Sequence, residues 1–133
     1  MTNNHPKKEE IDKIIKSEKN PDLNQSQLIE ELKKKYSNSH IPYNLEGLIN
    51  HKNGHFNDAI QNFNRAKEKL VNEDNNNKDL SILYQNIGVS YNKLSQTENA
   101  ITSLIQSIDL NNNGRTVTFF TVDFDMSMGN GLS

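Results

Sequence analysis

The 133-residue chain contains no cysteine and no tryptophan, and its charge has almost no excess of one sign, with 15 basic and 17 acidic residues. Without cysteine, disulfides, zinc ribbons and thiol chemistry are excluded. A net charge of −2 gives no basic field that would attract nucleic acid. No stretch approaches the ~20 apolar residues of a membrane span, and the N-terminal residues lack the apolar core of a signal peptide. We therefore expect a soluble cytoplasmic protein that binds neither nucleic acid nor a membrane.

Hydrophobic residues are scarce as well, at 32% of the chain. Globular domains usually contain ~45–50% apolar residues. Leu, Ile, Val and Phe make up about a quarter of the chain, which remains above the ~20% level at which disorder becomes the default expectation. The length allows one domain. These proportions predict a single folded unit with a small core.

Apolar residues recur with the 3.6-residue period of a helix over most of the chain. Leu28, Leu32 and Tyr36 fall on one helical face, and Pro21 ends the segment before them. The pattern predicts helices over about residues 11–19, 24–36, 40–52, 57–71, 80–94 and 97–110, with a polar loop over 72–78. The predicted fold class is all-α, built from antiparallel helix pairs.

The C-terminal residues 114–133 differ from the rest. Apolar residues stand at positions 120, 122, 124, 126 and 128, and this period of two is typical of a strand. A lone strand on a helical protein has no sheet to join, so we expect an irregular or strand-like, non-helical tail. Such a tail offers a route to β-augmentation of a partner, or to self-association. The candidate contact residues for self-association are Phe119, Phe120, Val122 and Phe124.

The helical part contains an internal repeat in which position i corresponds to position i + 41. Identical pairs at this offset include Tyr43 and Tyr84, Gly47 and Gly88, Lys52 and Lys93, Ala59 and Ala100, and Ile60 and Ile101. Because the pairs include both turn and core positions, chance is a poor explanation. We expect Gly47 and Ala59 where the two helices of one repeat come closest, since a larger side chain would push them apart.

The second copy resembles the tetratricopeptide repeat, whose signature is W-x2-L-G-x2-Y followed by A-x3-F. The matching residues are Tyr84, Ile87, Gly88, Tyr91, Ala100 and Leu104. The first copy departs from the family pattern at Glu46 and Asn50, where the family prefers Leu and Tyr. The resemblance implies a short α-solenoid, with one repeat in residues 40–79 and another in residues 80–113.

The offset between the two copies exceeds the family period of about 34 residues by about two helical turns. We expect the extra residues between Lys67 and Asp79, as a longer second helix followed by the polar loop. Upstream, residues 22–39 form a helix that is a candidate for half of a degenerate preceding repeat, with Gln25 where the family has Ala. Residues 1–21 are expected to form a polar segment with a short helix.

Tetratricopeptide arrays generally act by binding, through a concave groove lined by the first helix of each repeat. The resemblance places the groove at Asn44, Leu48, His51 and Lys52 of the first copy and at Gln85, Asn86, Val89, Asn92 and Lys93 of the second. This surface is rich in amides and has two lysines, which suits an extended peptide or a helix. The carboxylate clamp of some family members is not expected, because Asn44 and Leu48 occupy two of its positions.

No catalytic motif is present, and His51 and His55, although four residues apart, are separated by an expected turn at Gly54. We therefore expect no enzyme activity, no catalytic residue, no cofactor and no metal. The expected function is that of an adaptor that binds a peptide or helix of a partner protein. The alternative is the N-terminal fragment of a larger repeat-containing enzyme or scaffold, with no activity of its own.

Overall fold

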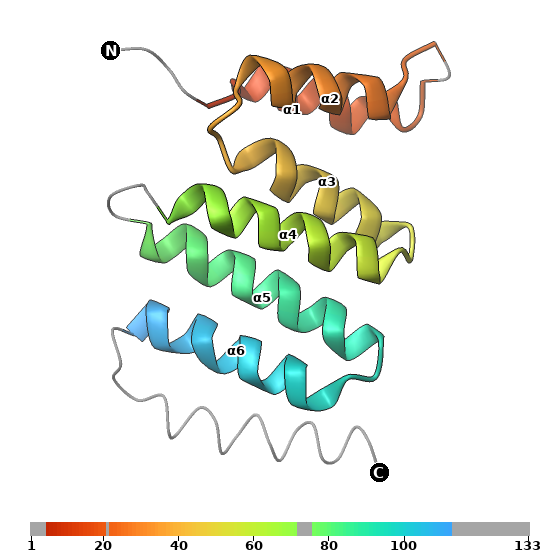
Figure 1. Ribbon diagram of the computed structural model, residues 1–133. Helices are drawn as coiled ribbons and strands as arrows, with labels where there is room; N and C mark the ends of the chain where they lie inside the picture. The colour runs from red at the N-terminus through yellow and green to blue at the C-terminus, as the bar shows by residue number, and fades with distance from the viewer. Residues whose placement is uncertain (1–4, 21, 72–75, 113–133) are drawn as a thin grey trace.

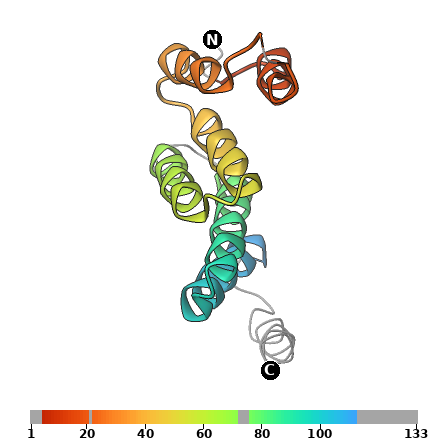
Figure 2. The same cartoon turned by 90° about the vertical axis from the view of Figure 1, so that its right-hand side faces the viewer.

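The computed structural model describes residues 5–20, 22–71 and 76–112, and these residues form six helices and no strand. The helices are α1 (Lys8–Ser17), α2 (Gln25–Lys35), α3 (Ile41–Lys52), α4 (Phe56–Leu70), α5 (Asn77–Lys93) and α6 (Thr97–Asn112). Consecutive helices run antiparallel and are stacked in chain order into an elongated array (Figure 1 and Figure 2). The predicted all-α fold class is confirmed. The tail predicted over residues 114–133 lies outside the described residues.

Polar side chains define the starts of α1 and α2. At α2, Asn24 Oδ1 accepts a hydrogen bond from a backbone N–H of the first turn at 3.1 Å, and so satisfies one of the donors that a helix start leaves unpaired. At α1, the backbone N–H of Lys7 donates to Glu10 Oε1 at 2.9 Å. Glu10 also accepts from the Tyr36 hydroxyl at 2.6 Å and pairs with Lys35 Nζ at 2.9 Å. This carboxylate therefore ties α1 to α2.

A tight turn separates α3 from α4, as the sequence predicts. Pro42 lies in the first turn of α3, where its missing N–H costs no hydrogen bond. After Lys52 the chain passes through Gly54, whose φ of +83° is in the left-handed region that glycine adopts without steric cost. The chain then enters α4 at Phe56.

The long connection between α4 and α5 differs from the prediction. The expected longer second helix is wrong, because α4 has 15 residues and its counterpart α6 has 16 residues. The extra residues instead lengthen α5, which has 17 residues against 12 in α3. Because α5 begins at Asn77, the polar loop predicted over 72–78 is shorter than expected. The added turn is held by packing, since Leu80 lies against the core and Ser81 is buried.

The apolar core lies in two clusters. One joins α4 to α5 and contains Ala59, Phe63, Ala66, Leu70, Leu83 and Ile87, with Tyr43, Leu80 and Tyr91 packed against it. The other joins α1, α2 and α3 and contains Ile14, Ile29, Leu32, Tyr36 and Leu45, with Ile11, Leu28 and Ile49 packed against it. The core therefore runs between successive helix pairs as well as within them.

Two glycines mark close approaches within the helix pairs. A Cβ atom added at Gly47 of α3 would lie 2.5 Å from Cε1 of Phe63 in α4. A Cβ atom added at Gly88 of α5 would lie 2.7 Å from Cγ of Leu104 in α6. Both distances are shorter than van der Waals contact. The residues at positions 47 and 88 must therefore be small, as the sequence predicts for Gly47.

Candidate functional site

Two side-chain contacts join α3 to α5 directly. Asn86 Nδ2 donates to Asn44 Oδ1 at 3.3 Å, and His51 Nδ1 lies 3.1 Å from Ser90 Oγ. Figure 2 shows that α3 and α5 follow one another along the array, with α4 to one side. These four residues form the floor of a surface between α3 and α5. We call this floor, together with the exposed side chains beside it, the α3–α5 face.

Exposed apolar side chains flank this floor. Leu48 is 44% exposed and Val89 is 38% exposed, and the two correspond at the offset of the internal repeat. Five of the exposed residues of α5 are spaced by three and four positions, so they share one helical face. These five residues are Lys78, Ile82, Gln85, Val89 and Asn92. Exposed apolar side chains therefore lie at corresponding positions of α3 and α5.

The surface continues toward α1 through Lys52. Lys52 Nζ forms an ion pair with Glu18 Oε1, just after the end of α1, at 2.8 Å. Beside this pair lies a cleft of about 180 Å³, whose apolar walls include Ile15, Leu48 and Ile49. Sequence reasoning missed Ile15 and Glu18. The signal that would have found them is spacing, because they correspond to Ile49 and Lys52 of α3 at the family period of about 34 residues.

The nine residues predicted for the groove fall into two groups. Asn44, His51 and Asn86 are half-buried and bond across the boundary between α3 and α5. The other six are exposed, namely Leu48, Lys52, Gln85, Val89, Asn92 and Lys93. The structure thus brings Asn44 to Asn86 and His51 to Ser90, whereas Lys52 is engaged by Glu18 from the preceding pair.

The α3–α5 face is cationic. The exposed cations of the two helices are Lys52, Lys78 and Lys93. The two helices contain two acidic residues, Glu46 and Asp79. Glu46 pairs with Lys33 of α2 at 2.6 Å, and Asp79 Oδ2 lies 4.0 Å from Nε2 of His40. Because both carboxylates are directed to other neighbours, lysines and amides dominate the charge and hydrogen bonding of the face.

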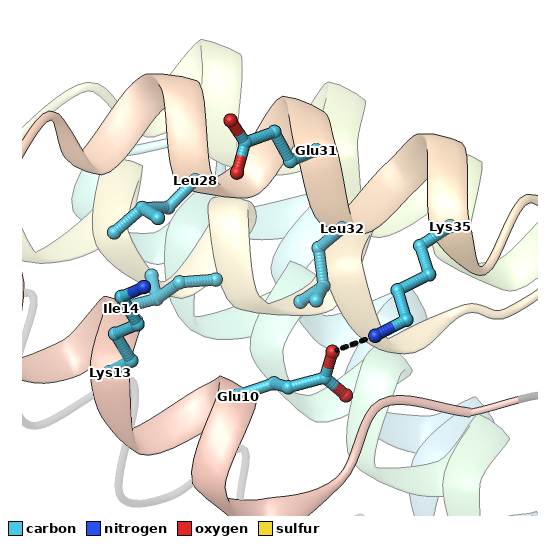
Figure 3. A pocket seen from close by; sticks show the side chains of 7 residues that line it. All are labelled: Glu10, Lys13, Ile14, Leu28, Glu31, Leu32 and Lys35. Carbon is cyan, nitrogen blue, oxygen red and sulfur yellow. Dashed lines mark hydrogen bonds and ion pairs between the residues drawn. The ribbon is translucent and has the colours of Figure 1, made fainter.

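A further cleft, of about 190 Å³, lies between α1 and α2 (Figure 3). Its apolar wall includes Ile14 and Leu32, which belong to the core of the first helix pair. The ion pair between Glu10 and Lys35 crosses it (Figure 3). We interpret this cleft as part of the packing between α1 and α2.

Two other features are absent from the part of the chain that the structure describes. None of these helices combines the length and apolar character that crossing a membrane requires. No group of three histidine or acidic side chains comes together there as a metal site. The ring of His51 packs edge-on against Phe56, with the ring centroids 5.0 Å apart.

One comparison with known proteins gives a match. Residues 82–113 match a family model described as tetratricopeptide repeat. The matched segment covers α5 from Ile82 onward and all of α6, and it does not include residues 40–79. No curated protein and no solved structure matches the chain.

Proposed function

Because the chain contains a tetratricopeptide repeat at residues 82–113, we propose that it is a protein–protein interaction module whose α3–α5 face binds a segment of a partner protein. The observation that carries this proposal is the pair of exposed apolar residues, Leu48 and Val89, on either side of a hydrogen-bonded floor. Amides and lysines surround this pair. Binding would remove apolar surface from water while polar neighbours set the register of the partner.

We propose that α3 and α4 form a second repeat. The support is geometric, because the approach of Gly47 to Phe63 is reproduced by the corresponding pair, Gly88 and Leu104. Because α3 packs on α4 as α5 packs on α6, α3 and α5 are equivalent helices. The equivalence explains why Leu48 and Val89 are both exposed on the same surface.

We propose that α1 and α2 form a third, degenerate repeat at the shorter family period of about 34 residues. The buried residues of α2 and α4 support it, because three buried positions correspond at that spacing. They are Ile29 and Phe63, Leu32 and Ala66, and Tyr36 and Leu70. About three stacked repeats are needed for independent stability. The first pair would therefore supply the neighbour on which α3 stacks, and would extend the binding surface to Ile15.

The amide groups favour an extended partner segment over a helix. A helix satisfies most of its backbone N–H and C=O groups internally, whereas an extended segment leaves them available for other partners. Gln85 and Asn92 are exposed amides beside Val89, and each has both a donor and an acceptor. Their chemistry matches an extended backbone.

The repeat of the array sets the expected spacing of apolar residues in the partner. Packed helices lie about 8–10 Å apart. A polyproline-type segment advances about 9 Å in three residues and returns to the same face after three residues. We therefore expect apolar side chains three residues apart in the partner, which would contact Val89 and Leu48 in turn.

A displayed library of random peptides, selected on the full chain, tests this function. Selected peptides should bind at least about tenfold more weakly to the variant Val89→Glu, because the charge replaces an apolar contact at the centre of the face. The matched control is Val71→Glu, since Val71 is 64% exposed and lies beyond the end of α4. Equal effects of the two substitutions, or no effect of either, would show that the α3–α5 face is not the binding site.

A further inference from the structure

The α3–α5 face has the same combination of side chains on both of its helices. On α3, Leu48 is followed one helical turn later by Lys52, and on α5, Val89 is followed one turn later by Lys93. Both apolar residues and both lysines are exposed. Residues four positions apart are neighbours on the surface of a helix. Each helix therefore presents an apolar side chain beside a cation.

The two lysines differ in their partners. Lys52 pairs with Glu18 at 2.8 Å, whereas Lys93 forms no ion pair within the residues that the structure describes. Lys78, at the other end of α5, is exposed as well. A segment with apolar and acidic side chains in close succession would match the face both in apolar contact and in charge.

A segment of this kind follows α6 in the same chain. Apolar and acidic residues alternate over Val122, Asp123, Phe124 and Asp125. Within residues 116–133, these two aspartates are the only charged side chains. The residue classes of the segment are therefore complementary to those of the face, with acidic groups opposite lysines and apolar groups opposite apolar groups.

The end of α6 lies beside the start of α5. Ser107 Oγ of α6 donates to the backbone oxygen of Ser81 at 2.7 Å, and α6 runs antiparallel to α5 (Figure 1). Val89 lies about 18 Å along the axis from the first residue of α5. With about 8–10 Å between neighbouring helices, the direct path from the end of α6 is about 20 Å. Residues 113–119 span about 23 Å when extended, so the chain from Phe119 onward can reach the face.

We propose that residues 119–125 dock on the α3–α5 face of their own chain and compete there with a partner protein. Phe119 and Val122 have the three-residue spacing expected of a segment that contacts this face. The two aspartates would then pair with the lysines of the face. A tethered segment has an effective concentration of about millimolar, so an external partner must displace it. The competition rests on the proposed function of the face, whereas the docking does not.

Paramagnetic relaxation enhancement in the full chain tests the docking. Because the chain has no cysteine, Ser127→Cys gives a unique site for a nitroxide spin label. In the 15N-labelled protein, the label should broaden the backbone amide resonances of Leu48 and Val89 more than those of α2. Broadening that avoids α3 and α5, or no broadening, would overturn the proposal. Equal broadening in a mixture of spin-labelled chains with separate 15N-labelled chains would also overturn it, because the occupant would then be a second copy.

Charge reversal in the spin-labelled chain tests the pairing of charges. Lys93→Glu should reduce the broadening at Val89 by at least about twofold. Adding Asp123→Lys and Asp125→Lys should restore part of it. The matched control is Lys34→Glu, because Lys34 is exposed in the last turn of α2 as Lys93 is in the last turn of α5. Equal loss in the two single variants, or no loss in either, would contradict the charge complementarity on which the docking is based.

The affinity for partner peptides tests the competition separately. The full-chain variant Phe119→Ser with Val122→Ser loses the apolar contacts but keeps its charges. Peptides selected on the chain should bind this variant at least about threefold more tightly than the wild type. The control is Leu132→Ser, which removes an apolar residue outside the docking segment. Equal affinity of all three chains would overturn the competition. Failure of the Val89→Glu test would contradict the proposed function and leave the docking seen with the spin label intact.

Discussion

Where α5 packs on α4, Ile87 is 3% exposed and lies among Phe63 and Leu83. Where α3 packs on α2, the corresponding residue of the first copy is Glu46, which pairs with Lys33 at 2.6 Å. The two junctions therefore join equivalent helices with different chemistry. The α4–α5 junction is apolar, whereas the α2–α3 junction combines apolar packing with an ion pair.

This difference has an energetic consequence. Full burial of an isoleucine side chain stabilises a fold by about 1.5–3 kcal/mol. A partly exposed ion pair contributes about 0–1 kcal/mol, because solvent screens it and two long side chains must be ordered. We therefore expect α1 and α2 to separate from the array more readily than α4 separates from α5. Local opening of this kind is common in repeat proteins, whose units contact only their neighbours.

The largest effect is expected for Ile87→Glu at the apolar junction. A carboxylate at this position would have to be buried without a partner or be protonated. The free energy of unfolding, measured by urea titration with circular dichroism, should fall by at least about 3 kcal/mol. The control is Ile82→Glu on the same helix, because Ile82 is 43% exposed. If both variants lose the same free energy of unfolding, burial of Ile87 at the α4–α5 junction does not stabilise the fold.

Gly88→Ala should have the next largest effect. The new methyl group would meet Cγ of Leu104 at 2.7 Å and the backbone oxygen of Ala100 at 3.2 Å, so α5 and α6 would have to move apart. Overpacking of this kind costs about 1–3 kcal/mol, to be measured by thermal and urea unfolding. The exposed Asn92→Ala variant provides a helix-propensity control. A stability gain in Gly88→Ala would show that the close approach is not required.

Local periodicity was sufficient for most of the fold. Leu28, Leu32 and Tyr36 placed α2, and the same reasoning identified six helices close to their observed bounds. The start of α5 was missed because Asn77 and its polar neighbours resemble a loop, while the contacts that favour helix there come from distant residues. Tertiary packing of Leu80 against the core overrides the local signal.

The site was only partly predictable, for a related reason. The family pattern placed Asn44 and Asn86 among the groove residues, but it did not predict the hydrogen bond that joins them. It did not find the ion pair between Glu18 and Lys52, which depends on how α1 stacks against α3. The polar side chains of the α2–α3 junction were visible only as the departures from the family pattern at Glu46 and Asn50. The sequence shows that apolar residues are missing there, but not which polar side chains meet.

Substitutions at the α2–α3 junction should change the free energy of unfolding less than the two substitutions above. Glu46→Leu alone removes one partner of Lys33 and should lower the free energy of unfolding by about 1 kcal/mol. Adding Lys33→Met replaces both partners with apolar side chains, and should return the stability to that of the wild type or above it. Urea unfolding of the two single variants and the double variant measures the coupling. Additive losses would show that the two side chains do not act as a pair.

The smallest effect is expected from acid, and it should be confined to the first helix pair. Hydrogen bonds from the Tyr36 hydroxyl and the Lys7 backbone, together with Lys35, lower the pKa of Glu10 from 4.5 to about 2. Glu10 therefore takes up a proton more readily in the unfolded chain than in the folded one. Its contribution to stability is complete above about pH 4.5 and is lost as the pH falls toward 2. Hydrogen exchange of α1 and α2 should accelerate in that range before exchange of α4 and α5 does. In Glu10→Gln this extra acid sensitivity should disappear, and its persistence would place the titrating group elsewhere.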